Sequence, residues 1–175
     1  GLPCVVKPNQ SGSSVGITIV RQFKQLDKAI ELALQCDPAK EILVEKYIKG
    51  REITAPILGN DQPIALPIVE IVPKREFFDY RAKYNAKLCE EIVPAQLSEQ
   101  ETKKIQQVGQ RVHQLFACRG LSRVDMIKQK DKIYVLEINT MPGMTPNSLF
   151  PKSARSAGIT FAQLIEKLVK LAYEK

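Results

Sequence analysis

Three side chains with oxygen donors, Asp125, Glu137 and Asn139, lie in two neighbouring segments that each alternate apolar and polar residues. This alternation predicts two β-strands, and polar residues two positions apart on a strand share one face of the sheet. Two carboxylates that face each other across a strand pair destabilise it unless a cation compensates their charge. Oxygen ligands of this kind are those that Mg²⁺ prefers in proteins. The sequence therefore predicts a magnesium site on this face.

The placement of the two carboxylates depends on the connection between the strands, which we expect at residues 121–128 and 133–139. Leu136 and Ile138 should enter the same core as the apolar residues of the first strand, so that the polar residues of both strands share the opposite face. In an antiparallel hairpin this matching of faces requires a loop with an odd number of residues, such as 130–132. Such a loop sets the aspartate opposite the glutamate.

Arg123 and His113 are the other candidates for a chemical role on these elements. Arg123 shares the predicted face of Asp125 and could neutralise negative charge that develops on a reacting oxygen. The alternative is an ion pair with one of the neighbouring carboxylates. His113, the only histidine, is expected at the surface or boundary of a helix, next to the core position Val112. The sequence offers no Ser/His or Cys/His arrangement for nucleophilic catalysis.

A second candidate site lies near the start of the chain, where Lys7 ends a predicted strand and precedes the Gly/Ser-rich residues 11–16. Small residues let backbone N–H groups approach phosphate oxygens, the hydroxyls of Ser13 and Ser14 add donors, and the lysine supplies a positive charge. A Walker motif is excluded because its lysine follows the glycines. The alternative is an ordinary Gly/Ser hairpin with a surface lysine.

Residues 45–48 and Glu52 form a third candidate site, for the nucleoside part of a nucleotide. The segment ends a predicted strand, where its backbone could contact the edge of a purine. The carboxylate of Glu52 could accept hydrogen bonds from ribose hydroxyls. Two solvated glutamates at strand ends are the alternative that the spacing also allows.

The elements that position these residues predict an α+β fold, mainly an antiparallel sheet with flanking helices. Strands are expected at residues 3–7, 15–20, 41–46, 51–58, 63–71, 121–128 and 133–139. Helices are expected from Phe23 to about Asp37, from the capping box at Ser98 to about Arg119 with Leu115 on its apolar stripe, and from Thr160 onward. Residues 73–89 and 141–151 are expected to form long loops.

Composition excludes several classes of protein. No apolar run approaches the roughly 18 residues of a membrane span. Four widely spaced cysteines without a Cys-x-x-Cys pair argue against zinc, and we expect reduced thiols in a cytoplasmic protein. The net charge of +7 attracts polyanions, but the basic residues form no arginine-rich run, so nucleic acid is not an expected partner.

Five motifs together resemble the D-alanine–D-alanine ligase family, whereas each alone suggests only the wider ATP-grasp superfamily. They are Lys7-Pro8 with residues 12–16, residues 45–52, residues 77–84, Arg123 with Asp125, and residues 136–146. The resemblance implies an ATP-grasp fold with an incomplete small lobe and a C-terminal lobe. Residues 1–49 would belong to the central, small domain and residues 50–175 to the C-terminal domain, with a lid loop at about 73–90.

The resemblance implies a cytoplasmic enzyme of peptidoglycan synthesis that joins two D-alanines while ATP is hydrolysed. ATP would phosphorylate the carboxylate of the first D-alanine, and the amine of the second would attack the acyl phosphate. The full-length enzyme would be a homodimer with no membrane or nucleic-acid partner. The chain matches only the later part of the family's enzyme and starts without a Met, so we expect it to form no dipeptide by itself.

The resemblance also assigns roles to residues. ATP would be bound by Lys7, Gly12, Ser13, Ser14, Glu45, Lys46, Tyr47, Ile48, Glu52 and Lys83. Two Mg²⁺ ions, or Mn²⁺ in their place, would be held by Asp125, Glu137 and Asn139. The catalytic set would be Arg123, Ser13, Tyr84 and the backbone of Gly143. The second D-alanine would be held by Gly143, Ser148 and Leu149.

In the family the lid closes over the site, with Tyr84 reaching Ser13, and a tyrosine here favours D-alanine as the second substrate. Ser11 and Arg81 stand where many members carry Glu, so we expect altered loop contacts. Two alternatives remain open at this point. One is another ATP-grasp ligase that joins a carboxylate to an amine, and the other is a noncatalytic module that binds nucleotide or nucleic acid.

Overall fold

The computed structural model describes residues 1–12, 14–73 and 89–174. Within them the chain divides into two compact units, one containing residues 1–49 and the other residues 50–72 and 91–174. The expected lid loop at 73–90 falls almost entirely outside the described residues. The assignment of the units to ATP-grasp domains stays a prediction.

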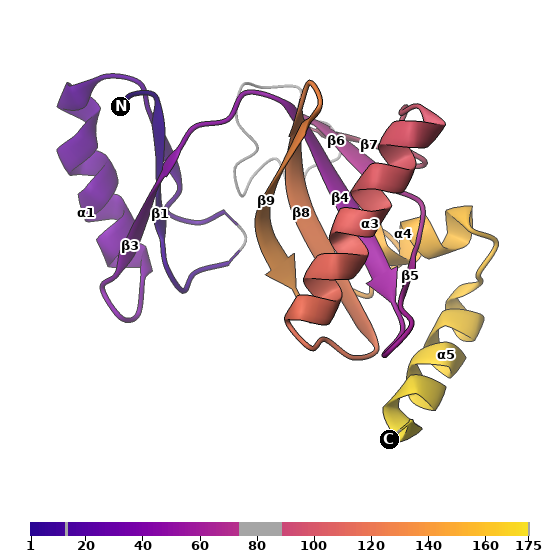
Figure 1. Cartoon of the computed structure of the whole chain (residues 1–175). Coiled ribbons are helices and arrows are strands. Elements are labelled where there is room, and N and C mark those ends of the chain that lie inside the picture. The colour runs from indigo at the N-terminus through magenta and orange to yellow at the C-terminus, as the bar shows by residue number, and fades with distance from the viewer. Residues whose placement is uncertain (13, 74–88, 175) are drawn as a thin grey trace. The chain divides into compact units, whose positions relative to one another are not determined.

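The first unit is a small antiparallel sheet covered by one helix (Figure 1). Its elements are β1 (Cys4–Pro8), β2 (Thr18–Val20), α1 (Leu26–Cys36) and β3 (Ile42–Lys46), with strand order β2-β1-β3. Val6 and Val20 from the sheet and Ala29 and Ala33 from α1 form its core. The small alanines let the helix lie close to the strands, so the unit is held together by a compact apolar layer.

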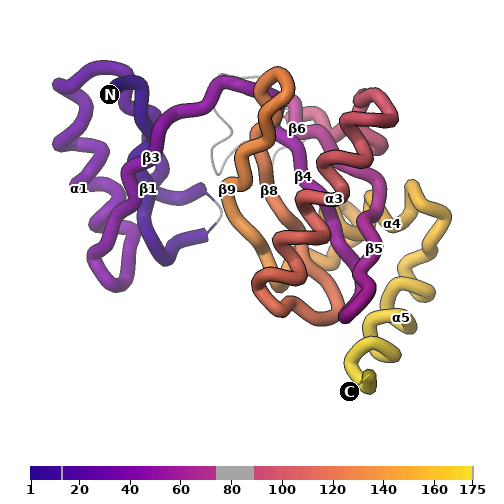
Figure 2. The backbone as a smooth tube through the Cα atoms, viewed as in Figure 1, coloured from indigo at the N-terminus to yellow at the C-terminus, as the bar shows by residue number. Residues whose placement is uncertain are grey.

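The second unit is a larger antiparallel sheet in the order β7-β6-β4-β8-β9, with β5 paired to β4. Its strands are β4 (Arg51–Leu58), β5 (Ile64–Ala65), β6 (Val69–Pro73), β7 (Cys89–Ile92), β8 (Leu121–Gln129) and β9 (Lys132–Asn139). Its helices are α3 (Glu99–Leu115), α4 (Leu149–Ser156) and α5 (Phe161–Tyr173). In the tube view β9 lies beside β8 at one edge of the sheet (Figure 2).

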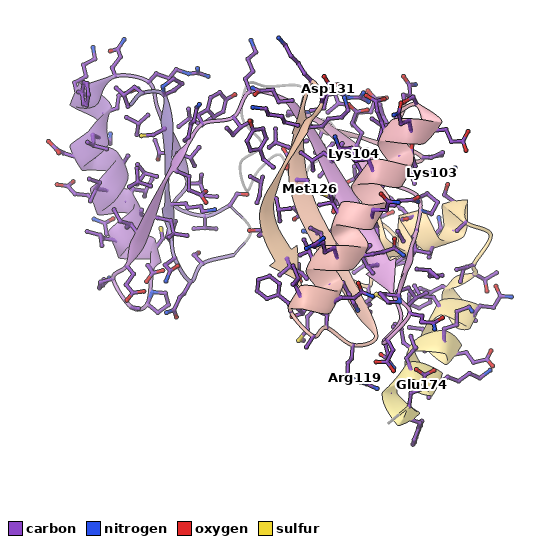
Figure 3. The ribbon with its side chains drawn as sticks, viewed as in Figure 1. Lys103, Lys104, Arg119, Met126, Asp131 and Glu174 are labelled. Carbon is purple, nitrogen blue, oxygen red and sulfur yellow. The ribbon has the colours of Figure 1, made fainter. Side chains whose placement is uncertain are left out.

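Helix α3 covers one face of this sheet. Ser98 and Glu101 form the predicted capping box at its start, and Ile105 is fully buried in the core with Val124 and Met126 of β8. Met126 lies beneath α3 (Figure 3). The helix approaches the sheet so closely that a Cβ on Gly109 would come within 2.9 Å of the Ala55 Cβ. A larger residue at this point would separate helix from sheet.

Polar contacts fix the start of α3 to the β8–β9 hairpin. The Lys128 ammonium lies 2.6 Å from the Glu101 carboxylate, and its hydrogen bond, together with those from Ser98, lowers the pKa of Glu101 to about 2. The Lys104 ammonium donates to the backbone carbonyl of Asp131 in the hairpin turn (Figure 3). Helix and hairpin are therefore joined at their ends as well as through the core.

A separate apolar cluster joins α4 and α5 to the end of β4. Its buried members are Leu58, Leu66, Phe150, Ala154 and Leu164. The C-terminal end of α5 is further fixed because Arg119 donates to the backbone carbonyl of Glu174 at 2.7 Å (Figure 3). None of the helices in the described part of the chain combines the length and apolar composition that crossing a membrane requires.

Several predicted elements differ from those observed. The strand predicted at 15–20 is only Thr18–Val20, and the helix predicted from Phe23 begins as a 3-10 turn that leaves Phe23 76% exposed. The strand predicted at 63–71 is split into β5 and β6 because the register against β4 shifts by one residue between them. Pro67 lies in that gap and has no N–H for a ladder.

Helix α4 replaces the later part of the loop predicted at 141–151. Ser148 takes the extended N-cap conformation, and Pro151 lies in the first turn, where a missing N–H leaves no hydrogen bond unmade. Phe150 is fully buried, and this burial drives the short helix onto the sheet. Only eight residues long, it falls below the length at which apolar periodicity is informative.

His113 contradicts the expectation of a surface or boundary position. Its side chain is fully buried, with Nδ1 2.7 Å from the Ser122 hydroxyl and Nε2 3.2 Å from the Gly59 carbonyl oxygen. Leu115, expected on the apolar stripe, is 72% exposed. The stripe is rotated because Gly109 and His113, one turn apart, face the sheet. Both ring nitrogens of His113 are paired when the ring is neutral.

We expect the stability of the second unit to fall as the pH is lowered below neutrality. Burial lowers the pKa of His113 from its usual 6.5, outweighing the opposite effects of Gly59 and Cys118. The unfolded chain therefore binds a proton that the folded chain does not, and acid favours unfolding. Between about pH 7.5 and about pH 5.5 the unfolding free energy in urea should drop by about 1 kcal/mol.

His113→Ala provides the control for this prediction, because His113 is the only histidine in the chain. The variant should be less stable by about 2–4 kcal/mol at neutral pH, since it leaves a cavity and an unpaired Ser122 hydroxyl. It should also lose the slope between these pH values. An unchanged slope in the variant would show that another group is responsible.

Candidate active site

The alternation of β8 places its polar side chains on the face of the sheet opposite α3. Val124 and Met126 are fully buried in the core beneath the helix. Arg123 and Asp125 alternate with them and so point to the other face. This is the face that the sequence predicted for the site.

Asp125 is held from two directions. Arg123 donates from Nε and from a terminal nitrogen to its two carboxylate oxygens, at 2.8 and 2.7 Å. Thr54, fully buried on β4 directly opposite Asp125, donates its hydroxyl to the same carboxylate at 2.6 Å. The ion pair named as the alternative for Arg123 is therefore present. It fixes the carboxylate and the guanidinium in one plane.

The guanidinium of Arg123 lies in a negative environment. Burial lowers the pKa of Arg123, but hydrogen bonding to Asp125 and the charge of this carboxylate outweigh burial and raise it. The negative charges of Glu137 and Glu52 also raise the pKa of Arg123. Within the second unit Arg123 is therefore stabilised by the charges of three carboxylates, and one of them, Asp125, is hydrogen-bonded to it. It remains charged under all physiological conditions.

Glu137 lies directly opposite Asp125 in the β8–β9 ladder, as the sequence predicted. The predicted route to this pairing, a three-residue loop, is wrong. Gln129 pairs with Lys132, so that the turn contains two residues, and Lys130 takes a left-handed φ of 51°. The register then shifts between Asp125 and Met126.

The extra residue that parity requires is therefore supplied by a β-bulge within the strand. Met126 pairs with Val135 and Asp125 with Glu137, which leaves Leu136 without a partner opposite. Leu136 is 41% exposed, contrary to the expectation that it enters the core, whereas Ile138 packs against the core as predicted. The bulge thus turns Glu137 onto the face of Asp125.

Asn139 completes the set of three oxygen donors at the end of β9. It pairs with Arg123 in the ladder, and its side-chain oxygen accepts a hydrogen bond from the Met141 N–H at 3.0 Å. Among the described residues no three His, Cys, Asp or Glu side chains gather closely enough to hold a metal ion on their own. A metal at this face would use two carboxylates and the amide oxygen of Asn139, a donor set that suits a hard cation.

The segment after β9 brings Gly143 against Ser148. A Cβ on Gly143 would lie 2.8 Å from the Ser148 hydroxyl, so a side chain here would displace it. That hydroxyl accepts from the Thr145 N–H at 3.1 Å and makes no cap to α4. Leu149 is the first residue of α4, and the backbone N–H groups of this first turn have no carbonyl partner within the helix.

In the first unit Lys7 and Glu45 form an ion pair. Their charged atoms lie 2.7 Å apart, although the sequence assigned one to phosphate and the other to adenine. They come from neighbouring strands, because Lys7 pairs with Leu43, two residues before Glu45. The Lys7 side chain is 17% exposed and the Glu45 side chain 44% exposed. A phosphate group binding here would compete with Glu45 for the lysine.

The other predicted nucleoside residues lie around the end of β3. Lys46 is its last residue, and the Tyr47 N–H donates to the Pro3 carbonyl at 3.2 Å. The Arg21 guanidinium lies 5.6 Å from the centre of the Tyr47 ring. Ile48 follows in the connection to β4, on which Glu52 lies in the second unit.

The Gly/Ser loop that follows Lys7 contains a turn, with the Val15 N–H donating to the Gly12 carbonyl at 3.2 Å. Ser14 has a left-handed φ of 59°, and a Cβ on Gly12 would meet no atom within 4 Å. Ser13, Lys83 and Tyr84 lie outside the described residues, as does Arg81. Their predicted roles remain predictions.

Sequence analysis did not identify two residues that hold parts of the predicted sites. Thr54 contacts Asp125 from 71 positions away, and Asp37 accepts the backbone N–H of Gln10 at 2.6 Å from 27 positions away. Neither contact leaves a local sequence signal. Asp37 was noted only as the residue at which a helix ends, although an Asp beside a Pro is also typical of a turn.

Comparison with known proteins identifies relatives along the whole chain. The family model described as D-ala D-ala ligase C-terminus matches residues 1–170. The D-alanine–D-alanine ligase of Syntrophobacter fumaroxidans is 49% identical over an alignment of 176 positions, which covers 99% of this chain and 56% of that protein. The ligase of Pelotomaculum thermopropionicum is 46% identical over 175 residues, 99% of this chain and 54% of that protein. The chain spans about half the length of these curated relatives.

Solved structures give the same result. A D-alanine–D-alanine ligase from Bacillus anthracis matches with a TM-score of 0.84 at 39% identity, over 98% of this chain and 55% of that chain. The same ligase complexed with ATP has a TM-score of 0.80 at 37% identity, over 98% and 54%. A D-Ala:D-Ser ligase from Enterococcus faecalis has a TM-score of 0.84 at 37% identity, over 97% and 49%. The predicted ATP-grasp fold is confirmed, and the chain belongs to the D-alanine–D-alanine ligase family, of which it matches the C-terminal part.

Proposed function

We propose that the protein of which this chain forms the ligase C-terminal part uses ATP to join two D-alanines, through an acyl phosphate, for peptidoglycan synthesis. The observation that carries the proposal is the polar face of β8 and β9, where Arg123, Asp125, Glu137 and Asn139 stand together. Family membership and the ATP complex of a relative support the use of ATP. D-alanine as substrate, a homodimer and a cytoplasmic location are parts of the proposal.

The metal part of the proposal assigns Mg²⁺ to Asp125, Glu137 and Asn139. Their pairing in the β8–β9 ladder supports it, because two carboxylates directly opposite each other favour a cation between them. Arg123 offsets part of their charge and orients the Asp125 carboxylate. Mg²⁺ held by these three residues would supply positive charge that offsets the negative charge of the transferred phosphoryl group.

Arg123 suits a role at the reacting centre as well as in the ion pair. A guanidinium has five N–H donors, and its two bonds to Asp125 leave three for other partners. The bidentate contact holds the group rigid, so its charge is already oriented where negative charge develops. We assign it, with the backbone of Gly143, to the oxyanion formed when the second amine attacks.

The remaining residues are assigned to the substrates. Lys7 and the backbone of Gly12 and Ser14 would bind ATP phosphates, with Lys7 leaving Glu45 when phosphate binds. The N-terminus of α4, at Ser148 and Leu149, would hold the carboxylate of the second D-alanine, because N–H groups there are unpaired within the helix. The nucleoside would be held by Glu45, Lys46, Tyr47, Ile48 and Glu52. Ser13 of the phosphate loop, with Lys83 and Tyr84 of the lid, completes the proposal.

A second candidate function is the ligation of D-alanine to D-serine, and one observation favours it. The D-Ala:D-Ser ligase from Enterococcus faecalis matches this chain with the same TM-score, 0.84, as the D-alanine–D-alanine ligase from Bacillus anthracis. The fold therefore does not distinguish the second substrate. Tyr84, the residue that favours D-alanine by resemblance, lies outside the described residues.

The choice of second substrate can be tested in a hybrid ligase in which this chain replaces the matching part of the Syntrophobacter fumaroxidans enzyme. With D-alanine as first substrate, kcat/KM for D-alanine as the second should exceed that for D-serine or D-lactate by about 10-fold or more. Phosphate release and product mass measure each reaction. A preference for D-serine would replace the first function with the second.

The metal assignment predicts that Glu137→Gln lowers kcat of this hybrid by about 100-fold or more at saturating ATP, because the amide removes one negative charge from the Mg²⁺ site. Glu137 is exposed, so the unfolding free energy of the variant should differ from that of the unchanged hybrid by less than about 0.5 kcal/mol. Mg²⁺ titration of phosphate release measures the effect, and a higher Mg²⁺ requirement is expected.

Glu99→Gln is the matched control, since Glu99 is an exposed glutamate whose ion pair, within the described residues, is with Lys103 in the next turn of α3. It should leave kcat and the Mg²⁺ requirement unchanged. Equal activity of Glu137→Gln and Glu99→Gln would contradict the metal assignment. A loss of activity without any change in Mg²⁺ requirement would move Glu137 to another role.

A further inference from the structure

The Gly/Ser loop of the first unit, residues 9–16, is fastened to the turn between α1 and β3, residues 36–41. The centre of this contact is Asp37, a charged residue that is only 1% exposed. Its carboxylate accepts three backbone N–H groups, from Gln10 at 2.6 Å, Ala39 at 2.9 Å and Glu41 at 3.1 Å. One of these donors belongs to the loop and two to the turn.

The two oxygens of Asp37 divide these bonds. Oδ1 accepts from Ala39 and Glu41 and so closes the turn in which Asp37 itself lies. Oδ2 accepts the N–H of Gln10, which lies 27 positions earlier in the chain. The carboxylate therefore joins a local turn to a distant loop, one oxygen for each.

Both ends of the loop are fixed to the same turn. At its start the Asn9 N–H donates to the Glu41 carbonyl at 3.2 Å, and the Asn9 side-chain amide donates to the Glu41 carboxylate at 2.8 Å. At its end Gly16 has a φ of 76°, and a Cβ there would come within 2.8 Å of the Cys36 Cβ. Between these ends a Cβ on Gly12 would meet nothing within 4 Å.

We propose that Asp37 is a positioning residue for the phosphate loop: it fixes the Gln10 end of the loop so that the backbone of Gly12 and Ser14, called the tip below, is already placed for ATP phosphates. The proposal rests on the proposed function, because it takes the loop to be the one that binds phosphate. Within the described residues the Asp37 carboxylate is hydrogen-bonded to Gln10, Ala39 and Glu41 and not to Gly12 or Ser14, so it acts on the tip through the loop backbone.

A carboxylate suits this position despite the negative charge of phosphate. Its charge is offset by the N–H groups that it accepts, so it acts on the loop through hydrogen bonds more than through repulsion. Burial raises the pKa of Asp37, but the backbone hydrogen bonds from Gln10, Glu41 and Ala39 outweigh burial and lower it. The group is therefore ionised at neutral pH and accepts the Gln10 N–H as a carboxylate.

Asp37→Asn tests the proposal sharply. The amide oxygen can replace Oδ1 and keep the bonds from Ala39 and Glu41, whereas the amide nitrogen replaces Oδ2 and cannot accept from Gln10. Asp37→Ser, which keeps a short acceptor for the turn but does not reach the loop, is the second variant. Asp27→Asn is the matched control, because Asp27 is an exposed aspartate in the first turn of α1.

The measurements use the full 175-residue chain. Calorimetry gives the Kd of Mg·ATP and, separately, of adenosine, which lacks phosphates. Amide hydrogen exchange compares peptides covering residues 9–16 with peptides covering β4. We expect Asp37→Asn and Asp37→Ser to raise the Kd of Mg·ATP by about 10-fold and to speed exchange in residues 9–16 alone. The Kd of adenosine and all values for Asp27→Asn should match the unchanged chain.

Five results would overturn the inference. Equal Mg·ATP affinity in Asp37→Asn and the unchanged chain would refute it while leaving the proposed function intact. Unchanged exchange in residues 9–16 would do the same. Faster exchange throughout both units, or an equal loss of adenosine affinity, would make Asp37 a general stabiliser. If the unchanged chain binds no Mg·ATP, the proposed nucleotide site fails first, and the inference fails with it.

Discussion

The alternation of β8 is the constraint on which the candidate site depends. Burial of Val124 and Met126 beneath α3 fixes which way every other residue of the strand points, and so places Arg123 and Asp125 on the opposite face. Each buried side chain of this size stabilises the fold by about 1.5–3 kcal/mol. The site inherits its rigidity from that burial, since β8 cannot rotate or slip by one residue without exposing its core.

The charges on this face are stable only as a group. Asp125 is held by Arg123 and by the buried hydroxyl of Thr54, and the guanidinium in turn is stabilised by the carboxylates around it. Removing one partner from such a set leaves the others without compensation, which costs more than the interaction itself contributes. The arrangement therefore favours a cofactor with positive charge over a substrate that brings none. The Lys7–Glu45 pair in the first unit has the same character on a smaller scale.

Sequence reasoning predicted what periodicity and parity control. The pairing of Asp125 with Glu137 follows from the need to bury Val124 and Ile138 on one face, and it is confirmed. Parity fixes only that one extra residue exists somewhere between them. It does not distinguish a longer turn from a bulge, and the exposed Leu136 is the result. For the same reason the capping box of α3 was found, but the rotation that buries His113 was not.

Contacts between distant segments lay beyond prediction. The bonds of Thr54 to Asp125 and of Gln10 to Asp37 join residues whose own neighbourhoods predict only a strand and a turn. Helix α4 was missed because its apolar pattern is short. Phe150 drives the helix onto the sheet, but in these eight residues the apolar residue that follows it at helical spacing is the small Ala154. The family resemblance located the candidate residues correctly along the chain, but their partners required the three-dimensional structure.

The bulge at Leu136 separates the length of the hairpin from the placement of its carboxylates. With two residues in the turn, removal of Leu136 would leave a regular ladder in which the same glutamate still faces Asp125. The hairpin can therefore gain or lose this residue in evolution without moving the pair, and members of the family that differ in length here can keep the same chemistry. Deletion of Leu136 therefore leaves the face of Glu137 unchanged. Insertion or deletion of one residue between Glu137 and Asn139 would instead turn Asn139 to the opposite face of the sheet.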